Sequence, residues 1–97
     1  MVGDNPDLTD PPSTFGGYLR FLRERQGLSL LEVVQHSRSS AERIDKGALS
    51  RFENDQQRVP ASQLVQLCRI YGAPVDEVME RLEHYLKRDR SSPTRNG

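Results

Sequence analysis

The chain has 97 residues, with 14 Lys or Arg residues balanced by 14 Asp or Glu residues, so its formal net charge is zero. This length supports one domain with a modest core, and the balanced charge gives no global basic field that would attract nucleic acid. A single cysteine, Cys68, excludes an intramolecular disulfide and a zinc site of several cysteines. No run of about 18 apolar residues is present and the acidic, proline-rich start does not resemble a signal peptide, so we expect a cytoplasmic protein.

The two ends of the chain differ in composition from its middle. Residues 1–12 contain three prolines and no apolar periodicity, which predicts a disordered N-terminal arm. Residues 89–97 have the same polar character and are expected to form a disordered tail. Residues 13–88 show apolar spacings that fit helices, and no stretch alternates as a half-buried strand would. The sequence therefore predicts one compact all-α domain of five helices.

The first predicted helix covers about residues 14–26 and begins after Ser13 or Thr14. An apolar stripe spaced by four and three residues marks its inner face and consists of Phe15, Leu19 and Leu22. Gly27 follows the last turn, where helices commonly end.

The second helix has a sharp start in the sequence. Ser29 precedes Glu32 by three residues, which is the spacing of a capping box. The helix is expected to run to about His36.

Residues 37–45 form a long connection after the second helix. Ser39 and Glu42 have the spacing to cap one extra helical turn within it. Ile44 is its apolar residue nearest the next helix, and we expect it to reach the core.

Three further helices are expected. Asp45 is a good N-cap for the third, at about 46–54, and the fourth covers about 61–71. The fifth opens at Pro74, a residue suited to a first turn, and runs to about Arg88. Its apolar stripe continues past the length that a small core needs and consists of Val75, Val78, Met79, Leu82 and Leu86.

The segments GYLRFLRERQGLSLLEVV, KGALSRFEND and VPASQLVQLCRIYGAPVDEVM, in this order, resemble the phage-repressor-type (lambda-repressor-like, XRE-type) helix-turn-helix family. The resemblance covers roughly residues 15–80. It implies a five-helix domain in which the third helix enters the DNA major groove and the second braces it across the backbone.

The resemblance also implies an ion pair between Arg23 in the first helix and Glu53 in the third. Helical geometry supports it independently, because at 100° per residue Glu53 lies about 40° from the inward-facing Leu49. An inward carboxylate needs a partner, and Arg23 is the best candidate.

The outer face of the third helix carries polar and small residues opposite Leu49 and Phe52. We interpret it as a surface that faces the DNA groove, where long cations donate to guanine or phosphate and a serine bonds either kind of base. The base-reading candidates are Lys46, Gly47, Ser50 and Arg51. The phosphate candidates are more scattered and include the start of the second helix, an anion site by its geometry. They are Ser29, Leu30, Arg38, Arg43, Asn54 and Arg58.

Some features depart from the family pattern. About nine residues connect the second and third helices, where three or four are usual, so the sequence leaves their angle open. Leu30 and Leu31 are apolar where polar residues are usual, and Gly47 leaves one usual base-reading position without a side chain.

The extended fifth helix predicts a homodimer. Its C-terminal half is expected to have little to cover within one subunit, and an apolar stripe without an internal target tends to find an external one. The interface candidates are Met79, Leu82, Tyr85 and Leu86. The alternative is that this half folds back onto the first helix, over Phe21 or Tyr18.

These features together predict a sequence-specific DNA-binding transcriptional regulator that binds a palindromic operator as a dimer. No catalytic constellation or cofactor motif is found, and His36 and His84 have no metal-ligand spacing, so neither an enzyme nor a metal site is expected. Two alternatives stay open. One is an antitoxin that binds both DNA and a toxin, and the other is a protein-interaction adaptor, favoured by Phe21, Leu30 and Leu31 as exposed apolar residues.

Overall fold

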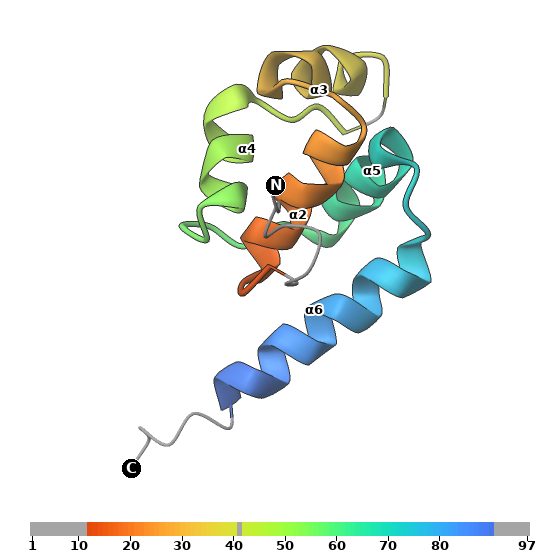
Figure 1. Ribbon diagram of the computed structural model, residues 1–97. Helices are drawn as coiled ribbons and strands as arrows, with labels where there is room; N and C mark the ends of the chain where they lie inside the picture. Colours follow the sequence, from red (N-terminus) through yellow and green to blue (C-terminus); the bar gives the residue numbers. More distant parts are fainter. Residues whose placement is uncertain (1–11, 41, 91–97) are drawn as a thin grey trace, which may run out of the picture.

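The computed structural model describes residues 12–40 and 42–90, with side chains as far as residue 87 (Figure 1). Within these ranges there is no strand, and the helices are α2 (Phe15–Arg25), α3 (Leu30–Ser37), α4 (Lys46–Glu53), α5 (Ala61–Tyr71) and α6 (Val75–Arg90). The predicted five-helix, all-α fold is confirmed, and each helix begins within one residue of its predicted start.

Most of each predicted tail lies outside the described residues. Of the arm predicted at 1–12, only Pro12 is described, and residues 91–97 of the tail lie outside the described ranges. Helix α6 ends at Arg90, two residues past the end at about Arg88 that was predicted for the fifth helix. No glycine or proline follows Arg88 before Pro93, and nothing in the intervening sequence forbids another half turn.

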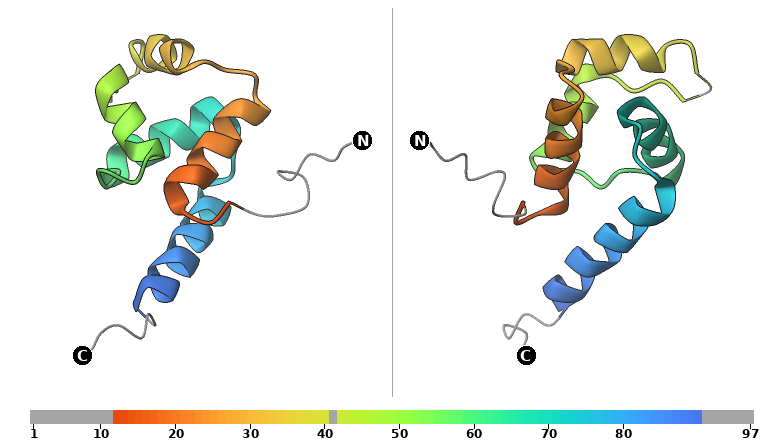
Figure 2. Two further views of the ribbon diagram at one scale, coloured as in Figure 1. Left: turned by 60° about the vertical axis from the view of Figure 1, so that its left-hand side comes forward. Right: turned by 45° about the vertical axis from the view of Figure 1, so that its right-hand side comes forward.

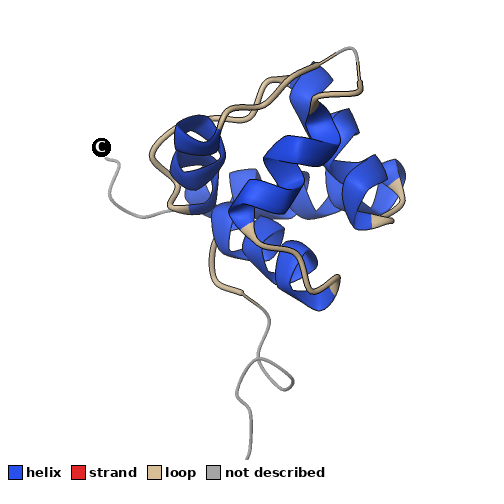
Figure 3. Cartoon of the chain, turned by 90° about the horizontal axis from the view of Figure 1, so that it is seen from above, coloured by secondary structure: helices blue, strands red, loops and turns tan. Residues whose placement is uncertain are grey.

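One core lies between the helices. Helix α2 runs through the middle of the bundle, with α3, α4 and α5 around it and α6 on the remaining side (Figures 1 and 3). The innermost side chains come from every helix and are Leu19, Val33, Leu49, Phe52, Leu67, Tyr71 and Val78. The apolar stripe predicted for the first helix faces this core, whereas the stripe predicted for the fifth does so only in part, through Val78 and Leu82.

The start of α2 is pressed against the end of α4. A Cβ added to Gly16 would lie 2.5 Å from the carbonyl oxygen of Phe52 and 2.7 Å from that of Glu53. The backbone N–H of Gly16 donates to Asp55 Oδ1 at 2.9 Å, and that of Gly17 donates to the N-cap Thr14 Oγ1 at 3.1 Å. The positive end of one helix dipole thus meets the negative end of the other. We call this contact the α2–α4 junction.

An ion pair closes the other side of the α2–α4 junction. Arg23 donates to both carboxylate oxygens of Glu53, at 2.7 Å and 3.0 Å, and a third donor reaches the Leu28 carbonyl at 2.8 Å. The two charged side chains are only 11 % and 5 % exposed. The hydrogen bond to Glu53 raises the pKa of Arg23. The pair predicted between the first and third helices is therefore present.

The connection between α3 and α4 turns back on itself. It leaves the end of α3, reverses direction and runs beneath α3 to the start of α4 (Figures 1 and 2). Ile44 is buried, as predicted, and its backbone N–H donates to the buried Ser37 hydroxyl at 3.0 Å. The extra helical turn predicted from Ser39 and Glu42 does not form. The Ser39 hydroxyl instead donates to the His36 carbonyl at 3.2 Å, closing the end of α3.

Helix α6 uses one side to cover the bundle. Val78 is fully buried, and Leu82 and Tyr85 are partly buried against the core. The Tyr85 hydroxyl donates to the Pro12 carbonyl at 2.6 Å, and its ring lies 6.3 Å from that of Phe15. The expectation that the C-terminal half has little to cover within one subunit is wrong for Leu82 and Tyr85, because α2 begins beside it. The contacts of α6 with α2 are made to Phe15 and, through the Arg81 guanidinium 5.0 Å from the ring centre, to Tyr18, which the alternative had named together with Phe21.

Candidate nucleic-acid interface

Helix α4 presents its polar face outward. The Asp45 side chain caps its start by accepting from the N–H of Ala48 at 3.2 Å. Leu49 and Phe52 are 0 % and 1 % exposed, so both inward positions are filled by the core. The base-reading candidates all lie on the opposite side, with Lys46, Gly47 and Arg51 exposed and Ser50 half-buried. The structure therefore brings these four candidates together on one surface.

Arg51 is held over this surface rather than extended from it. Its Nε donates to the Gln57 side-chain oxygen at 2.8 Å. Its Nη1 lies 3.3 Å from the place that a Cβ on Gly47 would occupy. The guanidinium thus reaches back along the helix by one turn and lies beside Gly47. Gly47 thus leaves room for this position of the guanidinium, which would have to shift slightly if a side chain were present there.

Gln57 is a residue of the site that the sequence did not reveal. It lies six positions after Arg51, beyond the helix, where no periodic spacing links the two. The chain turns at Asp55, whose φ is 60°, and the backbone N–H of Gln56 donates to the Arg51 carbonyl at 2.8 Å. This turn brings Gln57 back to Arg51.

Asn54 does not reach outward in this structure. Its side-chain nitrogen donates to the Ser50 carbonyl at 2.9 Å, and its backbone closes the C-terminal end of α4. In the free protein Asn54 therefore caps the end of α4, a role that asparagine commonly performs because its amide competes well for backbone carbonyls, and its phosphate contact stays a prediction.

The start of α3 has the predicted capping box. Ser29 Oγ accepts from the N–H of Glu32 at 3.1 Å, and the Glu32 carboxylate accepts from the N–H of Ser29 at 2.8 Å. The hydrogen bond from the Ser29 backbone lowers the pKa of Glu32. The N–H groups of Leu30 and Leu31 still lie in the first turn, where no intrahelical acceptor exists. A phosphate there would share the helix end with a carboxylate, which weakens this position as an anion site.

The arginines of the loops lie in separate places. Arg38 follows the far end of α3, about 13 Å from Ser29 along the axis of the helix. The carbonyl of Arg43 accepts from the Gln63 side chain at 3.3 Å, so that part of the connection lies over the start of α5. Arg58 is exposed between α4 and α5. The six phosphate candidates therefore do not form one cluster.

Residues 12–40 and 42–90 contain no group of three or more His, Cys, Asp and Glu side chains placed to hold a metal ion. None of the helices in those ranges combines the length and the hydropathy needed to cross a membrane.

The comparisons with known proteins agree with this geometry. A family model described as a helix-turn-helix domain matches residues 14–82, which includes α2 to α5 and half of α6. A crystal structure of the clp gene regulator ClgR from Corynebacterium glutamicum is similar, with a TM-score of 0.62 and 25 % sequence identity over 82 % of this chain and 79 % of that chain. A search of curated protein sequences gives no match. The matched family model spans most of the chain, which therefore belongs to the helix-turn-helix domain family.

Proposed function

We propose that this protein is a DNA-binding transcriptional regulator that reads a palindromic operator as a dimer, with the outer face of α4 in the major groove. The observation that carries this proposal is the arrangement of α4. Its large apolar side chains are buried in the core, and Lys46, Ser50 and Arg51 lie together on the outer surface. Membership of the helix-turn-helix family and the likeness to a gene regulator support the same function.

Arg51 is the residue best placed to read a base. A guanidinium donates to the two major-groove acceptors of guanine at once, and a good bidentate contact of this kind contributes about 1–3 kcal/mol of discrimination. The Gln57 side chain bonds Nε and leaves the two terminal nitrogens for such a contact. The small Gly47 beside it allows the helix to approach the groove closely.

The test begins with selection of bound sequences from a random DNA pool. Arg51→Ala should then lose discrimination at one base position, whereas Lys46→Ala should either do the same or weaken all sequences alike. In the second case the salt dependence of binding should fall by about one unit of slope. Arg69→Ala is the matched control, because Arg69 is an exposed arginine on a different helix. If both α4 variants bind the selected site like the unmodified protein, α4 is not the reader.

A second candidate function is protein binding, as an antitoxin or an adaptor. Leu31 is 50 % exposed at the start of α3, which favours a partner there. The other two apolar residues of this hypothesis are less available, since Leu30 and Phe21 are half-buried. The Arg25 guanidinium also lies 5.5 Å from the centre of the Phe21 ring. Leu31→Ser would separate the candidates, because it should leave an α4-mediated complex with DNA intact and disrupt binding to a protein partner.

A further inference from the structure

Helix α6 has a second apolar face that the bundle does not cover. Val75, Met79 and Leu86 are 38 %, 43 % and 41 % exposed. At 100° per residue these three positions fall within about 40° of one another, beside the face that holds Val78 and Tyr85 against the core. Figure 1 shows that the second half of α6 extends past the rest of the bundle. A row of three large apolar side chains is thus left in water along almost the whole helix.

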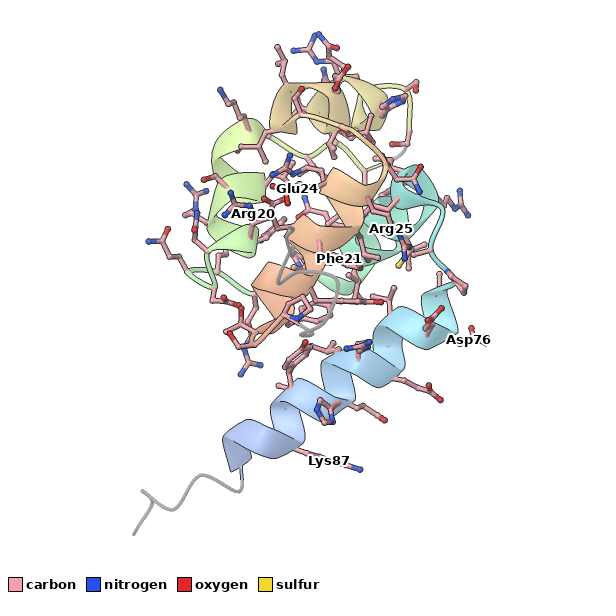
Figure 4. All side chains as sticks on the ribbon, viewed as in Figure 1. Arg20, Phe21, Glu24, Arg25, Asp76 and Lys87 are labelled. Atoms are coloured by element: carbon pink, nitrogen blue, oxygen red, sulfur yellow. The ribbon has the colours of Figure 1, made fainter. Side chains whose placement is uncertain are left out.

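The two halves of α6 carry opposite charge. From Val75 to Glu80 there are three acids and no base, and from Arg81 to Arg90 there are four bases and two acids. Figure 4 shows Asp76 and Lys87 near the two ends of the helix. The helix dipole favours this order within the first and last turns only. The change of sign between Glu80 and Arg81 lies beyond the first turn, and Arg81 itself lies over the bundle, with its guanidinium 5.0 Å from the centre of the Tyr18 ring.

We propose that α6 of a second copy covers this face in the antiparallel direction, a proposal that rests on the dimer proposed above. The two-fold axis passes between residues 82 and 83, midway between Met79 and Leu86, so each Met79 packs on Leu86 of the partner subunit. The acidic half of each helix then lies along the basic half of the other. A parallel pair would place like charges side by side, which is the less stable arrangement.

The groove beside Leu86 suits the side chain that this pairing brings to it. A hollow of about 740 Å³ lies between α6, the start of α2 and the loop after α4, and its apolar walls include Phe15, Val59, Leu82 and Leu86. Methionine has three rotatable bonds and fills irregular apolar gaps well. Met79 of the partner subunit, packed on Leu86, lies at the edge of this hollow.

Glu83 is the residue least suited to the proposed pair. It lies next to the axis, so each carboxylate approaches its own copy. Glu83→Gln should therefore tighten the dimer. Glu80→Lys, which removes one favourable charge from the acidic half, should loosen it.

Disulfide cross-linking of the full-length protein tests the direction of pairing. In an antiparallel pair, two copies of Met79→Cys are separated by about 10 Å along the axis, too far for a bridge, and the same holds for Leu86→Cys. Each variant alone should therefore stay monomeric on a non-reducing gel, while a mixture of the two should cross-link. The native Cys68 is buried and can remain in place.

Two results would overturn the proposal. Cross-linking of either variant with itself would show a parallel pair, and no cross-link in the mixture would show that these faces do not meet. Both measurements are made without DNA. Cross-linking in the mixture from a protein that selects no DNA sequence would support the pairing and overturn the proposed regulatory function instead.

Discussion

The α2–α4 junction is tightly packed, whereas one face of α6 is exposed. At the junction, two helix ends meet so closely that a single methyl group on Gly16 would strike backbone carbonyls, and the charged pair beside it is almost fully buried. In α6, one side packs on the bundle and the other leaves Met79 and Leu86 in water. The junction fixes the position of α4, whereas α6 can gain a partner without disturbing the contacts that position the surface proposed to face DNA.

The largest expected effect comes from breaking the ion pair at the junction. Glu53→Ala or Arg23→Ala should lower the free energy of unfolding by about 3–5 kcal/mol, because each strands a charge that is buried. Denaturant unfolding measures this. The double variant should be less damaged than the sum of the two single variants, and strict additivity would show that the two residues do not interact.

Gly16→Ala tests how tight the junction is. The added methyl has to displace backbone atoms of α4, and overpacking of this kind typically costs about 1–3 kcal/mol. Gly17→Ala is the matched control in the same helical turn. Its Cβ would meet only the Thr14 hydroxyl at 3.3 Å and the Pro12 side chain at 3.5 Å. Equal melting temperatures for the two variants would contradict the close approach of α2 and α4.

Two tyrosines allow the regions to be compared by the same substitution. Tyr85→Phe removes the hydrogen bond from α6 to Pro12 and should cost about 0.5–1.5 kcal/mol. Tyr71 is completely buried, and its hydroxyl has no partner among the described residues, so Tyr71→Phe should be neutral or stabilising. The less buried tyrosine should thus matter more. A larger loss from Tyr71→Phe in thermal unfolding would show that its hydroxyl is bonded.

The smallest effect on folding is expected at the exposed face of α6. Met79→Ser and Leu86→Ser should change the stability of the isolated subunit by no more than about 0.5 kcal/mol, as is usual for exposed positions. Sedimentation should nevertheless show a weaker dimer. Leu82→Ser is the contrasting variant, since it should destabilise the subunit itself. If Met79→Ser unfolds the monomer, the face is part of the core after all.

Local patterns in the sequence predicted the helices and their starts well. The N-caps Ser29 and Asp45, and the apolar stripes, depend on residues three or four apart, and such spacings determine structure directly. Arg23 and Glu53 are far apart in the chain. Helical geometry placed Glu53 inside, where a carboxylate needs a partner, and the family resemblance indicated Arg23 as that partner. Helical spacing also predicted that the candidate residues of α4 lie on one outer face, and their role in DNA binding stays a prediction.

The contacts that the sequence did not reveal join segments that no periodic spacing relates. Tyr85 bonds to a carbonyl 73 positions earlier, and Arg51 bonds to a loop residue that a turn brings back. Gly16 carried no signal of its own, since the need for a glycine comes from the backbone of another helix. Such contacts depend on how the finished elements pack rather than on the propensity of any one segment.

The hydrogen bond between Ser37 and Ile44 has a consequence for how this domain can vary. It fastens the two ends of the α3–α4 connection within the core, with the Ile44 nitrogen 3.0 Å from the Ser37 hydroxyl oxygen, so the segment between Ser37 and Ile44 starts and ends at one place. We therefore expect the angle between α3 and α4 to depend little on the length of the segment between Ser37 and Ile44. Doubling its length should cost only about 0.6 kcal/mol of closure entropy. The segment is a natural insertion point, at which a tag or a peptide ligand can be added without moving α4.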